Sequence, residues 1–217
     1  MARVRRSALH SPAAWACLLV PLVIGLAADL LSKEVAFERL NVQWFDDAAG
    51  TPQVRSDAYD AIPNYLTFQA HVNYGAVFGI GQGARVLFIV VSLLAIALLG
   101  YLFVRSGAQR LYQILVGMLL AGVLGNLYDR AVHGYVRDMI YALPGWQFSD
   151  LAGFLPAREI FPWIFNIADS LLCVGVFGMF VYSLFAQDQD AAETGADVEA
   201  KPVGATPERV ATGHVES

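Results

Sequence analysis

Residues 162–185 read PWIFNIADSLLCVGVFGMFVYSLF, a mostly apolar run with one charged side chain, Asp169. A helix needs roughly 20 apolar residues to cross a bilayer, so we expect Pro162–Phe185 to span a membrane. A rise of about 1.5 Å per residue places Asp169 roughly 10 Å along this helix. Asn166, three residues earlier, shares its face. An acid inside a membrane helix costs about 2.5–3.5 kcal/mol, so Asp169 is expected to face a cavity and carry function.

Three further apolar runs are long enough to cross a membrane: Ala13–Ser32, Ala84–Val104 and Leu111–Leu127. The whole chain is 57% hydrophobic and only 15% charged, and its mean hydropathy of +0.51 is too high for an ordinary soluble domain. We therefore predict an all-α membrane protein with four transmembrane helices.

Basic residues set the expected orientation of these helices. Three arginines precede the first span and two lie in the turn between the second and third: Arg3, Arg5, Arg6, Arg105 and Arg110. The positive-inside rule places both ends of the chain in the cytoplasm. The first apolar run is longer than the core of a cleavable signal peptide, so we expect it to be retained. The segments Lys33–Gly83 and Tyr128–Phe161 then lie on the outer face of the membrane.

The two outer segments show weaker patterns. Polar and apolar residues alternate loosely over Tyr65–Val72, which indicates a short strand or hairpin. The polar stretch Asp46–Asp60 is interpreted as a surface loop. Phe148–Leu155 begins with helix-capping residues and has apolar residues at helical spacing. The prediction is a small extracytoplasmic β element together with a short interfacial helix.

Charge separates a membrane domain, 1–187, from a tail, 188–217. Seven of the 19 acidic residues follow Gln187, against two basic ones, so the formal charge of −5 belongs to the tail. Few large apolar residues occur there, and we expect it to be disordered and cytoplasmic. The remainder is balanced in charge and has no basic stripe for nucleic acid. Cys17 and Cys173 show no metal-ligand or disulfide pattern, and are interpreted as packing residues.

Asp138 is a second candidate for the site at the outer ends of the helices. Gly134 allows the chain to turn back after the third span, and the apolar side chains of Val136, Met139 and Ile140 could carry Asp138 back toward the depth of Asp169. Considered alone, Asp138 beside Arg137 would also fit a surface ion pair. Asp29 and Asp129 lie at the outer ends of the first and third spans, where a structural role is equally reasonable.

Four short blocks, each at the outer end of an expected span, together resemble the bacterial lipoprotein signal peptidase family (signal peptidase II). The blocks are Asp29-Leu-Leu-Ser-Lys33, Asn73-Tyr-Gly-Ala-Val-Phe78, Gly125-Asn-Leu-Tyr-Asp-Arg130 with Gly134-Tyr-Val-Arg-Asp138, and Phe165-Asn-Ile-Ala-Asp169. Each block is weak alone, but their order makes the match specific over roughly Leu22–Phe185. Departures from the family pattern are Ala121, Met139 and Tyr74, and none removes a catalytic group.

The resemblance implies a membrane-embedded aspartyl endopeptidase. It would remove the signal peptide from diacylglyceryl-modified prolipoproteins by cutting before the lipidated cysteine, with no metal or cofactor. Its partners would be prolipoprotein and membrane lipid, and we expect a monomer. The family's catalytic pair matches Asp138 and Asp169. Its supporting residues match Asp29, Lys33, Asn73, Asn126, Asp129, Arg130 and Asn166.

The chemistry of these residue types agrees with such a role. Two neighbouring carboxyl groups do not both ionise readily, so one retains a proton and the pair can act as base and acid. The amides of Asn126 and Asn166 can orient the pair without adding charge. Arg130 could pair with Asp129. Asn73, beside small residues, would border the path of an extended peptide or would cap a turn.

Other classes of protein share some of these sequence features. A small transporter or proton-conducting protein would also place Asp and Asn in the membrane, but broken helices or repeated halves are not evident. Presenilin-like and prepilin peptidases typically have a Gly-x-Gly-Asp block, which is absent. A scaffold would not gather polar residues at one end of several spans. The segment Gln147–Pro156 could form a lid over the site or an anchor on the membrane.

Overall fold

The computed structural model describes the backbone of residues 7–75, 84–151 and 158–199, and the side chains of these ranges except residues 150, 151 and 186–199. The chain divides into two compact units, Met1–Met179 and Phe180–Ser217. The candidate site lies entirely in the first unit.

Within the described residues, four helices are long and apolar enough to cross a membrane, which confirms the four predicted spans. They are α1 (Pro12–Arg39), α2 (Arg85–Arg105), α3 (Arg110–Val132) and the Ile167–Phe185 part of α5 (Ile167–Glu199). A 3-10 turn, η1 (Ala8–His10), precedes α1. α1 and α3 extend beyond their predicted apolar runs, because each carries polar residues at its end.

Helix α3 is the centre of the first unit, and small residues on it allow neighbouring helices to approach closely. A Cβ at Gly117 would collide with the backbone oxygen of Leu18 in α1, and one at Gly122 would lie 2.6 Å from the backbone oxygen of Ala168 in α5. Apolar residues of α1, α2 and α3 form the buried core: Ala14, Leu18, Leu99, Phe103, Val116, Leu119 and Leu120. The remaining apolar side chains on α2 are largely exposed, as expected for a lipid-facing helix.

The β structure is more extensive than the small element that the sequence predicts. β1 (Gln43–Asp46) and β2 (Pro52–Arg55) form an antiparallel hairpin. A second, antiparallel sheet has the order β3 (Ala58–Ile62), β4 (Leu66–Asn73), β5 (Val136–Ala142) and β6 (Ile164–Phe165).

β4 confirms the predicted strand at Tyr65–Val72, whereas the surface loop expected over Asp46–Asp60 is wrong. That segment contains β2 and the beginning of β3. β1 and β3 are fully exposed and β2 is exposed at both ends, so these strands need no strict apolar alternation and give little periodic signal.

Three boundaries bear on the remaining predictions. The fourth helix begins at Ile167 instead of Pro162, because Ile164 and Phe165 pair with β5. α4 (Phe148–Leu151) covers the first half of the predicted interfacial helix, and residues 152–155 lie outside the described residues. α5 continues as far as Glu199, and the rest of the tail lies outside the described residues, so its disorder stays a prediction.

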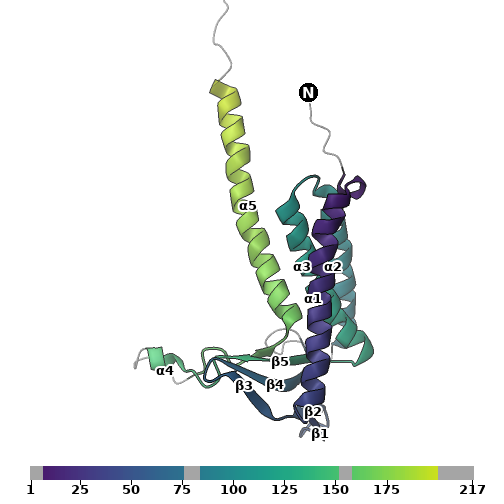
Figure 1. Cartoon of the computed structure of the whole chain (residues 1–217), viewed down its shortest axis with the longest axis vertical. Coiled ribbons are helices and arrows are strands. Elements are labelled where there is room, and N and C mark those ends of the chain that lie inside the picture. The colour runs from purple at the N-terminus through teal and green to yellow at the C-terminus, as the bar shows by residue number, and fades with distance from the viewer. Residues whose placement is uncertain (1–6, 76–83, 152–157, 200–217) are drawn as a thin grey trace, which may run out of the picture. The chain divides into compact units, whose positions relative to one another are not determined.

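One end of α1 and α3 meets the β structure, and the short turn between α2 and α3 lies at the other end (Figure 1). α3 ends where Gly134 adopts a left-handed conformation, φ +89°, which favours glycine. Arg85 of α2 donates from Nε and Nη2 to the backbone oxygens of Arg130 and Ala131, at 2.7 and 2.9 Å. This turn sends the chain directly into the strand β5, which carries Asp138.

Candidate active site

Asp169 and Asn166 are held together by the way α5 begins. The backbone N–H of Asp169 donates to Asn166 Oδ1 at 2.9 Å, and the backbone N–H of Asn166 donates to Asp169 Oδ2 at 3.3 Å. This reciprocal pair is a capping box, which satisfies backbone donors at the start of a helix. The Asp169 carboxylate is therefore fixed by the same contacts that begin the helix.

Asp138 lies on β5 and reaches the same cluster. It is 1% exposed. Asn166 Nδ2 donates to its Oδ1 at 2.6 Å, and Asn73 Nδ2 donates to its Oδ2 at 3.2 Å. Asn73 stands opposite Val136 in the β4–β5 register, so it approaches Asp138 along the diagonal. Asn166 thus contacts both carboxylates of the predicted pair.

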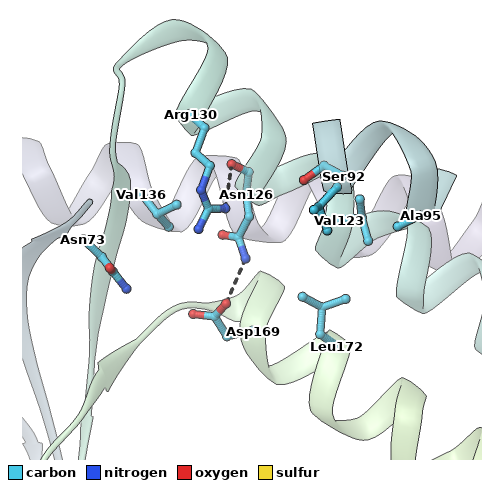
Figure 2. Close-up of a pocket in the computed structure, with 10 residues that line it drawn as sticks. Asn73, Ser92, Ala95, Val123, Asn126, Arg130, Val136, Asp169 and Leu172 are labelled. Carbon is cyan, nitrogen blue, oxygen red and sulfur yellow. Dashed lines mark hydrogen bonds between the residues drawn. The ribbon is translucent and has the colours of Figure 1, made fainter. Parts of the chain in front are cut away.

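Asn126 of α3 connects Asp169 to a buried cation. Its Nδ2 donates to Asp169 Oδ1 at 2.8 Å, the contact drawn as a dashed line in Figure 2. Its Oδ1 accepts from Asn166 Nδ2 at 3.2 Å and from Lys33 Nζ at 3.3 Å. The ammonium of Lys33 is therefore one amide away from Asp169.

Lys33 is fully buried between two carboxylates that are buried as well. Its Nζ lies 2.7 Å from Asp29 Oδ2 and 3.3 Å from Asp129 Oδ2. Asp29 Oδ1 accepts the backbone N–H of Ala168 at 2.8 Å, and so fixes the first turn of α5 against α1. A Cβ at Gly125 would collide with Asp29 Oδ2, so the glycine makes room for this arrangement.

Arg137 completes the buried network, and the sequence reasoning missed it. Its Nε and Nη2 donate to Asp129 Oδ1 at 3.1 and 2.9 Å, and its backbone N–H donates to Asp129 Oδ2 at 2.9 Å. Burial lowers the pKa of Arg137, but the hydrogen bonds and charges of Asp129 and Glu34 outweigh that effect and raise it. An ion pair between Arg137 and Asp138, considered for the sequence alone, does not form.

Arg130 does not pair with Asp129, which corrects the expected partnership. Its Nη2 donates to the backbone oxygen of Gly75 at 2.8 Å, and its Nη1 to that of Asn126 at 3.4 Å. Its guanidinium lies 4.9 Å from the centre of the Phe88 ring. Asp129 is already occupied by Lys33 and Arg137, so Arg130 is available to fasten the segment after Asn73.

A cavity of about 210 Å³ opens beside these residues. Figure 2 shows Asp169, Asn126, Arg130 and Asn73 toward one side of it and the α2 residues Ser92 and Ala95 toward the other. Its remaining lining is apolar and comes from Val91, Val123, Val136 and Leu172. The cavity therefore combines a carboxylate with an apolar wall, as a site for a peptide with apolar side chains requires.

Burial is the main influence on the proton of Asp138. Burial, and then the charge of Asp169, raise its pKa to about 8, whereas the hydrogen bonds from Asn166 and Asn73 act in the opposite direction. At neutral pH the pair of carboxyl groups therefore retains a proton. Two carboxyl groups that share a proton can act as general base and general acid.

The comparisons with known proteins agree with this geometry. The family model for signal peptidase (SPase) II matches residues 22–185. The chain belongs to the signal peptidase II family. The lipoprotein signal peptidase of Staphylococcus haemolyticus is 31% identical over 139 residues, which cover 63% of this chain and 78% of that protein. That of Staphylococcus aureus strain MRSA252 is 35% identical over 122 residues, 55% of this chain and 66% of that protein.

The fold is shared with solved membrane enzymes. A bacterial membrane enzyme determined in meso at 2.3 Å resolution superposes with a TM-score of 0.63 at 23% identity, over 86% of this chain and 96% of that one. A second, at 1.9 Å resolution, gives 0.58 over 84% and 98%. Membership of the signal peptidase II family favours a peptidase over the transporter alternative.

All nine residues singled out from the sequence lie in one connected network or in direct contact with it. They are Asp29, Lys33, Asn73, Asn126, Asp129, Arg130, Asp138, Asn166 and Asp169. Among the described side chains, no buried polar atom lacks a hydrogen-bond partner.

Proposed function

We propose that this chain is an aspartic endopeptidase that removes the signal peptide from diacylglyceryl-modified prolipoproteins, with Asp138 and Asp169 as its catalytic pair. The observation that carries the proposal is the contact of one residue, Asn166, with both carboxylates. Asn166 Nδ2 donates to Asp138, and its backbone N–H donates to Asp169. Membership of the signal peptidase II family supports the substrate class.

The reaction would use a single proton on the pair. The ionised carboxylate takes a proton from a water molecule, whose oxygen attacks the carbonyl carbon of the residue before the lipidated cysteine. The protonated carboxyl donates to the carbonyl oxygen and then supports protonation of the leaving amine. Asp169 lines the cavity whereas Asp138 is almost fully buried, so the water would bind against Asp169.

The surroundings would hold the substrate in the membrane. Apolar side chains of α2 and α5 line the cavity beyond Asp169, where a signal peptide or its lipid could pack against the bilayer. We propose that the ends of the chain are cytoplasmic, that the site lies near the outer face of the inner membrane, and that the enzyme acts as a monomer. Its partners would be prolipoprotein and membrane lipid.

Cleavage by the purified protein in detergent tests the proposal. A synthetic precursor with a diacylglyceryl cysteine is expected to be cut directly before that cysteine, and the same precursor without the lipid is not. Asp138→Asn and Asp169→Asn should each lower kcat by at least about a thousandfold, because each removes half of the acid–base pair. The double variant should be scarcely slower than either.

A matched control removes a carboxylate elsewhere. Glu38→Gln alters an exposed acid near the end of α1 and should retain parental activity. Thermal unfolding and elution from a sizing column would establish that the variants are folded. Substantial cleavage by either aspartate variant would refute the assignment of the pair, and cleavage of the unlipidated precursor at the same rate would refute the substrate class.

A further inference from the structure

The residue directly before Asp138 has every polar atom engaged. Besides the three contacts with Asp129, Arg137 Nη1 donates to Glu34 Oε2 at 2.8 Å, and its backbone oxygen accepts from Asn166 Nδ2 at 3.4 Å. Its guanidinium lies 6.0 Å from the centre of the Phe37 ring. Arg137 is only 5% exposed, and it is enclosed by residues of α1 and α3 and by Asn166, which precedes α5.

Arg137 also balances the negative charge of the buried acids next to the catalytic pair. Two fully buried carboxylates, Asp29 and Asp129, face the buried cations Lys33 and Arg137. Without Arg137, the single ammonium of Lys33 would have to serve both acids. Lys33 also donates to Asn126, whose amide donates to Asp169. A displacement of Lys33 toward Asp129 would therefore shift Asn126 and change its contact with Asp169.

We propose that Arg137 is a positioning residue for cleavage, which acts by neutralising Asp129 and by fixing the start of β5 so that Asp138 meets Asn166. This inference rests on the proposed function. Both Asp129 oxygens accept hydrogen bonds from Arg137, one from the backbone and one from the fork of the guanidinium. A bidentate contact of this kind fixes orientation in a way that a single point charge does not.

The charges that surround this contact determine the direction of the expected change. They are Asp29, Lys33 and Glu34 on α1, Arg130 on α3, Asp138 on β5 and Asp169 on α5, and the Tyr135 hydroxyl also lies within the field of Arg137 and Asp129. Removal of Arg137 exposes the pair to the negative charge of Asp129. The last proton of the pair then becomes harder to remove, so the alkaline limb of the rate profile moves to higher pH.

Three variants test the inference. Arg137→Met should lower kcat at least about tenfold with KM within about twofold, and should move the alkaline limb up by at least about half a pH unit. Arg137→Lys keeps the charge and should retain the parental limb while recovering only part of kcat. Arg39→Met removes an exposed arginine from the end of α1 and should behave as the parent in both respects.

Adding Asp129→Asn to Arg137→Met separates neutralisation from general loss of structure. If Arg137 acts through the charge of Asp129, the double variant returns the alkaline limb to its parental position. A parental kcat and pH profile for Arg137→Met would overturn the inference. An unshifted limb accompanied only by a lower melting temperature would also overturn it, because that pattern reports a purely structural role.

Two further outcomes have defined meanings. Should Arg137→Met not fold, Arg137→Lys decides alone: kcat at least about threefold below the parent at an unchanged melting temperature supports the inference, and parental kcat overturns it. An unsubstituted protein that does not cut the lipidated precursor would refute the proposed function itself, whereas an active parent with unaffected Arg137 variants would refute only the role of Arg137.

Discussion

Cleavage is expected to fall steeply as the pH rises above neutrality, because the reaction needs one proton on the catalytic pair. Burial, and then the charge of Asp169, raise the pKa of Asp138 to about 8. A carboxyl with a raised pKa retains its proton below that value and loses it as the pH rises through it. The protonated fraction would be about 90% at pH 7 and about 10% at pH 9, so kcat should fall about tenfold between them.

Initial rates on the lipidated precursor, at saturating substrate and from about pH 6 to pH 10, would measure this limb. Returning the enzyme from pH 9 to pH 7 should restore its activity, which separates titration from unfolding. The observed midpoint belongs to Asp138 and Asp169 together, since the two groups interact. A kcat that is constant over the whole range would refute the reasoning, because it would mean that no acid with a raised pKa takes part.

Three other perturbations follow from the fold. Gly125→Ala should abolish cleavage and lower the melting temperature, because the new methyl group would collide with Asp29 Oδ2. Gly100→Ala, where the space is open, should do neither. Equal behaviour of the two variants would contradict the packing argument. Cysteines placed at Asp57 and Arg110 should label only from the outer and the cytoplasmic side respectively, and the reverse pattern would invert the proposed topology. Truncation after Asp188 should leave kcat and KM unchanged, and a well-folded but slower truncation would assign a role to the tail.

The sequence predicts the helices well, and the residues that it singles out for the site lie together in the fold. Apolar runs of membrane length reveal the spans, and Asp169 and Asn166 stand out since polar groups are costly there. The same two residues form an Asn-x-x-Asp capping box, a local signal that would have placed the start of α5 at Ile167 instead of Pro162.

What the sequence could not reveal depends on contacts between distant segments. Arg137 pairs with Asp129 and Glu34 because the turn at Gly134 folds β5 back against α1 and α3. The exposed strands β2 and β3 owe their conformation to pairing with β1 and β4. Neither arrangement leaves a periodic pattern, so Arg137 resembled a surface residue and the strands resembled a loop.

The kind of group that contacts each acid explains why one pair of aspartates can be catalytic and the other structural. Asp29 and Asp129 contact the cations Lys33 and Arg137 directly. Asp138 and Asp169 receive their side-chain hydrogen bonds from the amides of Asn73, Asn126 and Asn166. An amide orients a carboxylate without fixing its charge. A lysine in direct contact would favour loss of the shared proton and leave two bases with no acid. In this site the amide of Asn126 stands between Lys33 and Asp169.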